Sequence, residues 1–151
     1  MNRILFVCHG NICRSVMAQW IMQDLIDKNG LGDRFETDSA AVSSEETGNT
    51  IYPKARRKLQ EKHVPIGKHY ARRIHSSDYQ TFDEIYLMDE SNARLIRRIL
   101  PHDPQEKIQF LLNDEEIDDP WYTQDFETAF QQIQCGCIKR LEELSHQPIH
   151  L

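Results

Sequence analysis

A short apolar run near the N-terminus, followed at once by a polar loop and a helical pattern, constrains the fold of this chain more than any other feature. Residues 4–7 are apolar and rich in β-branched and aromatic side chains, which is typical of a strand buried on both faces of a parallel sheet. From Arg14 to Leu25, apolar residues recur about every four positions, as on one face of a helix, and the pattern ends at Asn29. The chain therefore begins with a strand, a loop and a helix.

The rest of the chain alternates strand and helix patterns in the same way. Strands are predicted at residues 4–7, 35–40, 84–88 and 108–111, and helices at residues 14–29, 51–63, 90–100 and 123–144. Such alternation indicates an α/β fold, with a parallel sheet and helices on both faces. Because the 151 residues contain no linker, repeat or low-complexity stretch, we expect one domain over residues 1–151. We expect the residues after Ser145 to form a frayed tail.

The loop between the first strand and the first helix has the features of an anion-binding nest. It lies between the carboxyl end of a strand and the N-terminus of a helix, where unpaired N–H groups and a partial positive charge favour an anion. Gly10 lets the backbone curl without a Cβ penalty, and Asn11 tolerates left-handed dihedral angles. Successive loop amides can then point at one phosphate.

Cys8 and Arg14 stand at either end of this loop, as a nucleophile and a phosphate-binding group would. A thiolate near a helix N-terminus and a cation has its pKa lowered from about 8.5 to about 4–7, whereas a free cysteine elsewhere is by default a small buried hydrophobe. The planar fork of Arg14 can hold two phosphoryl oxygens, more tightly as charge spreads over them in the transition state. Ser15 either donates its hydroxyl to the thiolate or caps the helix, and the residues alone leave both roles open.

Residues 7–15, Val-Cys-His-Gly-Asn-Ile-Cys-Arg-Ser, strongly resemble the signature of the low-molecular-weight protein tyrosine phosphatases. Later blocks resemble that family in the same order and extend the resemblance over nearly the whole chain: Asp38-Ser39-Ala40-Ala41, Met88-Asp89-Glu90-Ser91-Asn92, Asp119-Pro120-Trp121-Tyr122 and Asp125-Phe126-Glu127-Thr128. The resemblance implies a four-stranded, flavodoxin-like sheet and an enzyme that hydrolyses phosphotyrosine and small aryl phosphates through a cysteinyl phosphate. We expect neither a metal nor another cofactor. Val16 and Gln19 depart from the family's usual Pro and Glu, outside the phosphate nest.

The resemblance also assigns roles to individual residues. Cys8 would be the nucleophile, Arg14 the phosphate-binding fork and Asp119 the general acid and base. The remaining loop positions would bind phosphate: His9, Gly10, Asn11, Ile12, Cys13 and Ser15. Asn11 would hold the loop in shape through hydrogen bonds with the positions matching Ser15, Ser39 and His69. Trp121 and Tyr122 would wall the pocket and stack on an aromatic substrate.

Two acidic features near these positions have either a role in the site or a purely structural role. The run of carboxylates in residues 114–119 favours a protonated Asp119, because like charges raise carboxyl pKa values, but such a run is otherwise a solvated loop. Asp89 follows the third predicted strand, so it either braces Arg14 or caps the next helix.

The four cysteines and the net charge of −6 limit the compartment and the partners of the chain. Cysteine within the active loop indicates a reducing compartment, so we expect a cytoplasmic protein. Cys13 is a candidate redox partner for an oxidised Cys8, whereas Cys137 lies on the apolar stripe of a helix and Cys135 is incidental. The negative charge argues against nucleic-acid and membrane partners, and we expect a monomer whose partners are its substrates.

Three other functions are compatible with a loop of this kind. A thiol-dependent arsenate reductase needs further cysteines in mid-chain, and none lies between Cys13 and Cys135. Related phosphoarginine phosphatases carry Thr at the position of Ile12, whose apolar side chain favours phosphotyrosine. A catalytically inactive phosphate-binding module has no need of Cys8, Arg14 and Asp119 together. Glu45 and Glu46 predict an acidic entrance that disfavours acidic phosphopeptides.

Overall fold

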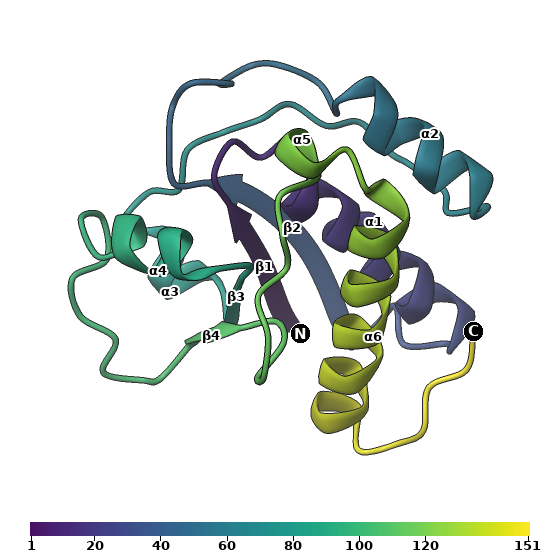
Figure 1. Cartoon of the computed structure of the whole chain (residues 1–151). Helices are drawn as coiled ribbons and strands as arrows, with labels where there is room; N and C mark the ends of the chain where they lie inside the picture. The colour runs from purple at the N-terminus through teal and green to yellow at the C-terminus, as the bar shows by residue number, and fades with distance from the viewer.

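Four parallel strands form the centre of the protein, whose computed structural model describes residues 1–151 (Figure 1). The strands are β1 (Asn2–Cys8), β2 (Phe35–Ala41), β3 (Glu84–Leu87) and β4 (Ile108–Phe110), in the spatial order β2-β1-β3-β4. All neighbouring pairs are parallel. From β1 the chain goes first to one side of the sheet and later to the other, so the carboxyl end of β1 is a topological switch point. Ligands of open α/β sheets bind at such points.

Helices cover both faces of this sheet, which confirms the predicted fold class. Helices α1 (Arg14–Lys28) and α6 (Phe126–Ser145) pack together on one face, and α2 (Pro53–Glu61) lies against both of them. The short α3 (Asp78–Thr81) and α4 (Glu90–Ile96) lie on the other side of the sheet (Figure 1). The single turn α5 (Pro120–Thr123) sits above the carboxyl end of the sheet, between the ends of β1 and α2.

Strand β1 is buried on both faces, as its apolar sequence predicts. Ile4 and Phe6 belong to a core of 29 buried residues on the side of α1 and α6, whereas Leu5 and Val7 belong to a second core of 12 on the side of α4. All four are fully buried. Because successive strand side chains point to opposite faces, β1 joins the two cores and holds the loop after it rigidly. Cys137 is buried in the larger core, as predicted.

Four predicted helix boundaries are wrong by two residues or more. The helix predicted to residue 63 ends at Glu61, two residues before the left-handed His63 (φ 59°), and proline or a cap explains the other three. The helix predicted from residue 51 begins at Pro53, because a residue before proline is pushed out of the α region, and Tyr52 has ψ 134°. The helix predicted to residue 100 ends at Ile96, shortly before Pro101. The helix predicted from residue 123 is interrupted at Gln124 (φ 61°), so that α5 and α6 are separate helices, each capped by an aspartate side chain.

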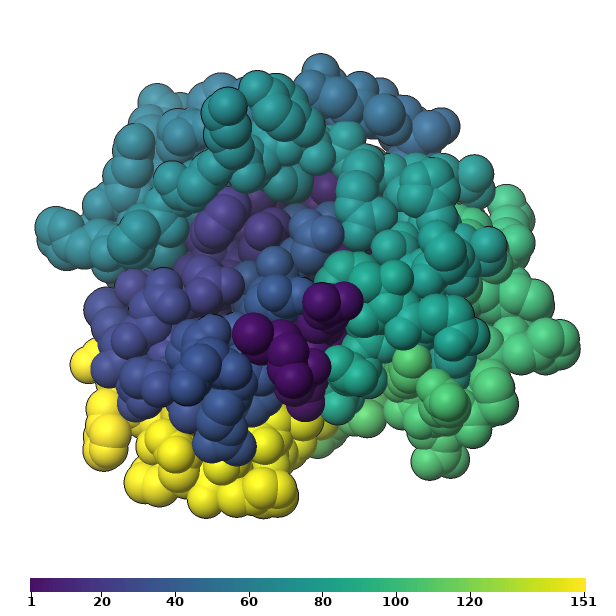
Figure 2. Space-filling view, turned by 180° about the vertical axis from the view of Figure 1, so that it is seen from behind, coloured from purple at the N-terminus to yellow at the C-terminus, as the bar shows by residue number.

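The C-terminal residues are fastened to the body, contrary to the predicted frayed tail. Backbone N–H and C=O of His150 both bond to the Asn29 side chain at 2.9 Å, and Ile149 packs against the larger core. Figure 2 shows the yellow C-terminal segment lying against the blue segment that follows α1. None of the helices combines the length and the apolar character that crossing a membrane requires.

Candidate active site

The loop of residues 9–13 connects β1 to α1 and leaves its backbone amides free. None of the N–H groups of residues 9–16 donates a hydrogen bond to another protein group. The left-handed conformation of the loop lies at Asn11 (φ 63°), as predicted for that residue. Gly10 is not in the left-handed region; a Cβ there would lie 3.2 Å from Cγ of Glu46, so Gly10 provides space for that side chain. The loop is a set of unpaired donors at a helix N-terminus, which suits an anion.

Cys8 lies at the floor of this loop beside a hydroxyl group. Its side chain is 3% exposed, and its Sγ lies 3.0 Å from Oγ of Ser15. Asn11 Nδ2 donates to the same Oγ at 2.8 Å, which leaves the hydroxyl proton of Ser15 free to point at the sulfur. Ser15 is the second residue of α1 and Cys13 occupies the cap position, so the capping role of Ser15 is excluded.

Two residues of the segment after α2 hold Asn11 in place. His69 Nε2 lies 2.7 Å from the backbone oxygen of Asn11, and the backbone N–H of Arg72 donates to Asn11 Oδ1 at 3.2 Å. Burial lowers the pKa of His69, so the neutral ring with its proton on Nε2 serves as the donor. Ser39 is not part of this network, contrary to prediction. It donates instead to Oε1 of Gln19 at 2.6 Å, at the position where the sequence departs from the family.

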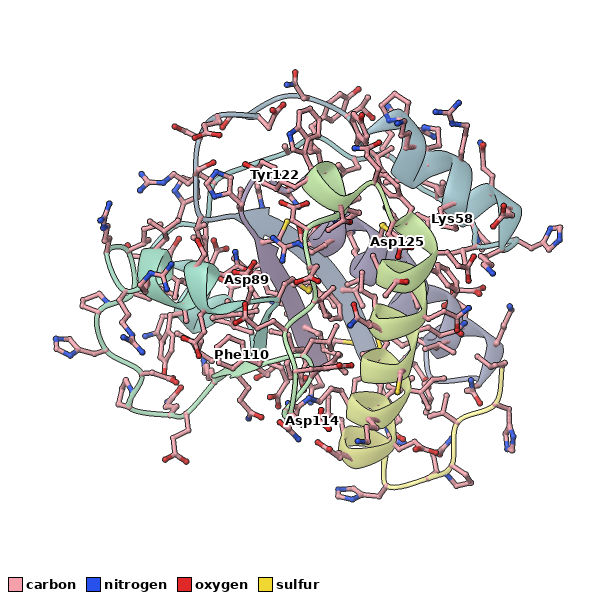
Figure 3. All side chains as sticks on the ribbon, in the orientation of Figure 1. Lys58, Asp89, Phe110, Asp114, Tyr122 and Asp125 are labelled. Carbon is pink, nitrogen blue, oxygen red and sulfur yellow. The ribbon has the colours of Figure 1, made fainter.

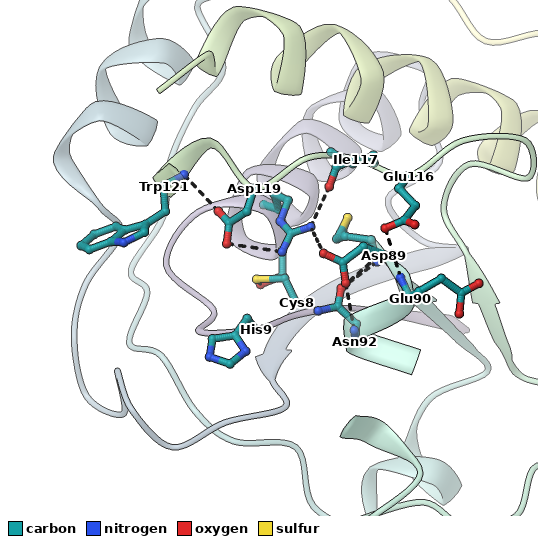
Figure 4. Close-up of polar contacts among 12 residues, drawn as sticks. Cys8, His9, Asp89, Glu90, Asn92, Glu116, Ile117, Asp119 and Trp121 are labelled. Atoms are coloured by element: carbon teal, nitrogen blue, oxygen red, sulfur yellow. Dashed lines mark hydrogen bonds and ion pairs between the residues drawn. The ribbon is translucent and has the colours of Figure 1, made fainter. Parts of the chain in front are cut away.

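Arg14 is almost fully buried and is held from two distant parts of the chain. Its Nη1 donates to Asp89 Oδ2 and to the carbonyl oxygen of Ile117, both at 2.7 Å, and its Nη2 lies 3.5 Å from Oδ2 of Asp119 (Figure 4). Burial alone would lower the pKa of Arg14, but the charges of Cys8 and the two aspartates raise it above its ordinary value. Its Nε is buried and has no protein partner. This group is therefore a charged donor fixed beside Cys8.

Asp89 performs both of the roles left open by the sequence. Its Oδ1 accepts from the backbone N–H of Asn92 at 2.9 Å and caps α4, while its Oδ2 accepts from Arg14. Asn92 Oδ1 in turn accepts from the backbone N–H of Met88 and of Asp89. A helix cap thus orients the carboxylate that orients Arg14, so the two roles that the sequence offered as alternatives are combined.

Asp119 caps the single turn α5 at the mouth of the loop. Its Oδ1 accepts from the backbone N–H of Trp121 at 3.0 Å, and its other oxygen faces Arg14. Trp121 lies against the ring of Tyr52, with 4.8 Å between ring centroids, and Tyr122 is 79% exposed. Pro120 occupies the first helical position, where its missing N–H costs nothing. Local capping therefore positions the carboxylate.

The acidic run before Asp119 does not surround it, contrary to the interpretation from the sequence. Asp114, Glu115 and Glu116 line a separate depression beside β4 and α4. Figure 3 shows Asp114 at the lower end of the molecule and Tyr122, on α5, at the upper end. The carboxylates that share a pocket with Asp119 are instead Glu45 and Glu46, from the loop after β2.

Most of the predicted site residues line one pocket of about 140 Å³, whereas Ser39 lies outside it. The pocket is lined by Cys8, His9, Gly10, Ile12, Cys13, Glu45, Glu46, Asp119, Trp121 and Tyr122. Arg14, Asn11 and Ser15 lie beneath it and are buried, and His69 supports the loop from behind. The pocket thus combines a thiol, a carboxylate and unpaired amides at the carboxyl edge of the sheet, with aromatic walls.

Comparison with known proteins agrees with this geometry. The model of the family described as low molecular weight phosphotyrosine protein phosphatase matches residues 3–149. Low molecular weight phosphotyrosine protein phosphatase 1 of Drosophila melanogaster is 35% identical over an alignment of 152 positions, gaps included. The alignment covers 95% of this chain and 97% of that protein.

Two solved structures show the same fold at similar identity. The crystal structure of YfkJ from Bacillus subtilis has a TM-score of 0.92 and 32% identity, covering 97% of this chain and 96% of that one. DARP, a Drosophila arginine phosphatase, has a TM-score of 0.84 and 33% identity, covering 95% and 98%. The chain belongs to the low-molecular-weight phosphotyrosine protein phosphatase family and is a hydrolase of that class.

Proposed function

We propose that this protein hydrolyses phosphotyrosine and small aryl phosphates in two steps through a phosphorylated Cys8. In the first step the Cys8 thiolate attacks phosphorus and the bond from phosphorus to the phenolic oxygen breaks. Asp119 gives its proton to that oxygen, so the leaving group departs as neutral tyrosine. In the second step a water molecule attacks phosphorus through its oxygen, and Asp119 takes a proton from that water. The bond from sulfur to phosphorus breaks, and the products are inorganic phosphate and the thiolate.

The observation that carries this proposal is the set of unpaired donors around Cys8. The loop amides and the buried Nε of Arg14 have no protein partner, and all belong to the loop or its helix. Donors fixed before the reaction stabilise the charge that develops on the phosphoryl oxygens, without reorganising at that moment. We assign phosphate binding to these groups, together with His9, Gly10, Ile12 and Cys13.

Ser15 supports the departure of sulfur in the second step. Sγ of Cys8 lies 3.0 Å from the Ser15 hydroxyl, and because a thiolate can only accept a hydrogen bond, the hydroxyl donates to it once Cys8 is ionised. Asn11 leaves that proton free, since its amide donates to the hydroxyl oxygen. A hydrogen bond to a thiolate stabilises the charged form, which makes Cys8 a better leaving group. Ser15 is therefore proposed as a residue of the second step rather than of phosphate binding alone.

Phosphoarginine is the second candidate substrate, because a Drosophila arginine phosphatase has the same fold at 33% identity. Ile12 lines the pocket with an apolar, β-branched side chain that offers no hydrogen bond to a guanidinium or to water. This favours an aromatic ring over phosphoarginine. Comparing wild type with Ile12→Thr on both substrates tests the assignment: wild type should prefer phosphotyrosine, and the variant should shift toward phosphoarginine.

Arsenate reduction is disfavoured by the placement of the cysteines. Cys137 is fully buried in the core, Cys135 is exposed on α6, and only Cys13 shares the pocket with Cys8. A relay of disulfides needs a third thiol that can reach the first pair. An assay of arsenate with a thiol donor should therefore give no turnover.

Hydrolysis of two aryl phosphates with different leaving groups tests the mechanism. Cys8→Ser should reduce turnover of both p-nitrophenyl and phenyl phosphate by at least about 10⁴-fold, because the alkoxide is not formed at neutral pH. Asp119→Ala should reduce phenyl phosphate turnover by about 10²–10³-fold and p-nitrophenyl phosphate turnover by less than about tenfold. A good leaving group needs little protonation, and this difference identifies the acid.

Asp118→Ala is the matched control, because Asp118 is the adjacent exposed carboxylate and does not line the pocket. It should leave the ratio between the two substrates unchanged. An active Cys8→Ser, or a loss of activity when a metal chelator is added, would contradict the mechanism.

A further inference from the structure

The loop after β2 forms one side of the pocket and carries two carboxylates to its rim. The backbone N–H groups of Val42 and Ser43 donate to the carbonyl oxygens of Cys8 and His9. This loop is therefore joined directly to the loop from Cys8 to Arg14, called the phosphate loop below. After Ser44, Glu45 and Glu46 of the same loop line the pocket together with Trp121 and Tyr122 of α5. The pocket is therefore bordered by carboxylates from one segment and by aromatic rings from another.

Both glutamates are oriented by contacts with neighbouring groups. Asn49 Nδ2 donates to Glu46 Oε2 at 2.6 Å, and Cγ of Glu46 lies over Gly10. Glu45 Oε2 lies 3.3 Å from Nε2 of His9, although 70% of the Glu45 side chain is exposed. Each carboxylate thus stays at the rim, where a substrate chain would pass.

The charges around the pocket are unbalanced. Its ten lining residues include three carboxylates, those of Glu45, Glu46 and Asp119, and neither lysine nor arginine. The guanidinium of Arg14 lies beneath the floor and is already paired with Asp89 and Asp119. The exposed Arg73 contacts the loop after β2 at the carbonyl oxygen of Val42 but does not line the pocket. The unpaired Nε of Arg14 and the loop amides bind an anion at the floor, but the rim above them attracts cations.

We propose that Glu45 and Glu46 select phosphotyrosine that stands next to lysine or arginine, an inference that rests on the function proposed above. The phosphate binds at the floor and the tyrosine ring lies beside Trp121. A neighbouring cationic side chain then pairs with Glu46, or with Glu45 in place of His9. A peptide with acidic neighbours places like charges together at the rim, which lowers its association rate and its affinity.

Matched phosphotyrosine peptides with basic, neutral or acidic residues on both sides test this inference. For wild type, kcat/KM should be about tenfold or more higher for the basic than for the acidic peptide at about 0.01 M salt. At about 1 M salt, where the Debye length is about 3 Å, the ratio should fall to about two. In the double variant Glu45→Gln and Glu46→Gln, the ratio of kcat/KM should be near two at both salt concentrations. The two carboxylate charges are then absent, so salt has little charge interaction at the rim to screen.

Glutamine is chosen because it keeps an oxygen acceptor for Asn49 and for His9 while it removes the charge. Glu36→Gln is the control, because it removes the same charge from β2 at the opposite end of the strand, where Glu36 pairs with Arg3. It should keep the wild-type ratio.

The outcomes separate this inference from the proposed function. Equal kcat/KM for basic and acidic peptides, together with normal turnover of p-nitrophenyl phosphate, overturns only the selection by Glu45 and Glu46. A preference that persists in the double glutamine variant overturns it as well, because the charge would then lie elsewhere. No turnover of any aryl phosphate overturns the proposed function and this inference with it.

Discussion

The phosphate loop and the segment that carries Asp119 lie on two sides of one pocket but are held in different ways. Asn11 and Ser15 are fully buried, and Asn11 is bonded by the distant His69 and Arg72 as well as to Ser15. On the other side, Trp121 is 44% exposed and Tyr122 is 79% exposed. Asp119 is oriented mainly by its own helix cap. One side of the pocket is part of the core, and the other is a short surface turn.

This difference corresponds to different demands on the two sides. Donors for a developing charge must be fixed before the reaction, and burial with long-range hydrogen bonds fixes them. A proton donor must instead meet leaving groups of different shapes, and a turn with few tertiary contacts is suited to that task. Substitutions in the loop should therefore affect folding and chemistry together. In the turn, replacing the exposed Tyr122 should affect substrate binding with little change in folding, whereas replacing Asp119 should affect the chemistry.

Among changes that leave Cys8 and Asp119 in place, Asn11→Ala should have the largest effect, and it tests whether the loop depends on its internal hydrogen bonds. Alanine loses the side-chain bonds to Ser15 and Arg72 and must adopt φ 63°, so we expect a loss of about 2–4 kcal/mol in unfolding free energy. Turnover of p-nitrophenyl phosphate should fall at least about 100-fold. Asn11→Gly, which accepts the left-handed backbone, should recover part of the stability in urea unfolding but little of the activity. Full activity in Asn11→Gly would show that the backbone alone forms the site.

Oxidation of Cys8 should have the next largest effect and tests the role of Cys13. We predict that a sulfenic acid formed on Cys8 by peroxide condenses with the Cys13 thiol to a disulfide and water, from which a thiol restores activity. Burial and the adjacent charge of Cys8 raise the pKa of Cys13, so condensation is expected to be slow. After mild peroxide and then dithiothreitol, wild type should recover and Cys13→Ser should not. Equal recovery would exclude Cys13 as the partner.

The buried His69 should make the stability of the loop depend on pH. Burial lowers its folded pKa below the ordinary 6.5, so the unfolded chain binds a proton that the folded protein does not. Stability should therefore be complete above about pH 6.5 and fall as pH decreases from there toward the folded pKa, by at most about 1.4 kcal/mol per pH unit. His69→Gln keeps a donor for the Asn11 carbonyl oxygen but does not titrate. The urea midpoint of this variant should fall less between pH 7 and pH 5 than that of wild type. If both midpoints change equally with pH, His69 is not the source of the pH dependence.

Tyr122→Ala should have the smallest effect and tests the other side of the pocket. Because the side chain is 79% exposed, the unfolding free energy should change by less than about 0.5 kcal/mol. KM for a phosphotyrosine peptide should rise about three- to tenfold through lost stacking, with kcat little changed. Trp121→Ala should cost more stability, since that ring packs on Tyr52. A large loss of kcat in Tyr122→Ala would mean that this turn also positions Asp119.

Much of the architecture could be predicted because it depends on local patterns. The apolar run of β1, the repeat of α1 and the left-handed Asn11 are properties of neighbouring residues, and the structure has all three. Errors occurred where local signals compete. At Pro53 the helical pattern starts two residues before the helix does, and at Gln124 the pattern continues across a residue that ends α5. The acidic run was misplaced because residues adjacent in the chain extend away from Asp119 along the surface.

By itself, the sequence determined the parallel α/β order, the loop from Cys8 to Arg14 and its family, because periodicity, turn chemistry and motif spacing act over a few residues. Only the tertiary structure decided which groups meet at the site. Arg14 bonds to Asp89 and to Ile117, 75 and 103 residues away, and Ser39 bonds to Gln19 instead of Asn11. The sequence predicted an acidic entrance from Glu45 and Glu46, but only the joining of the loop after β2 to the phosphate loop places them in one pocket with Asp119. Such contacts depend on how strands and helices pack, which no local pattern encodes.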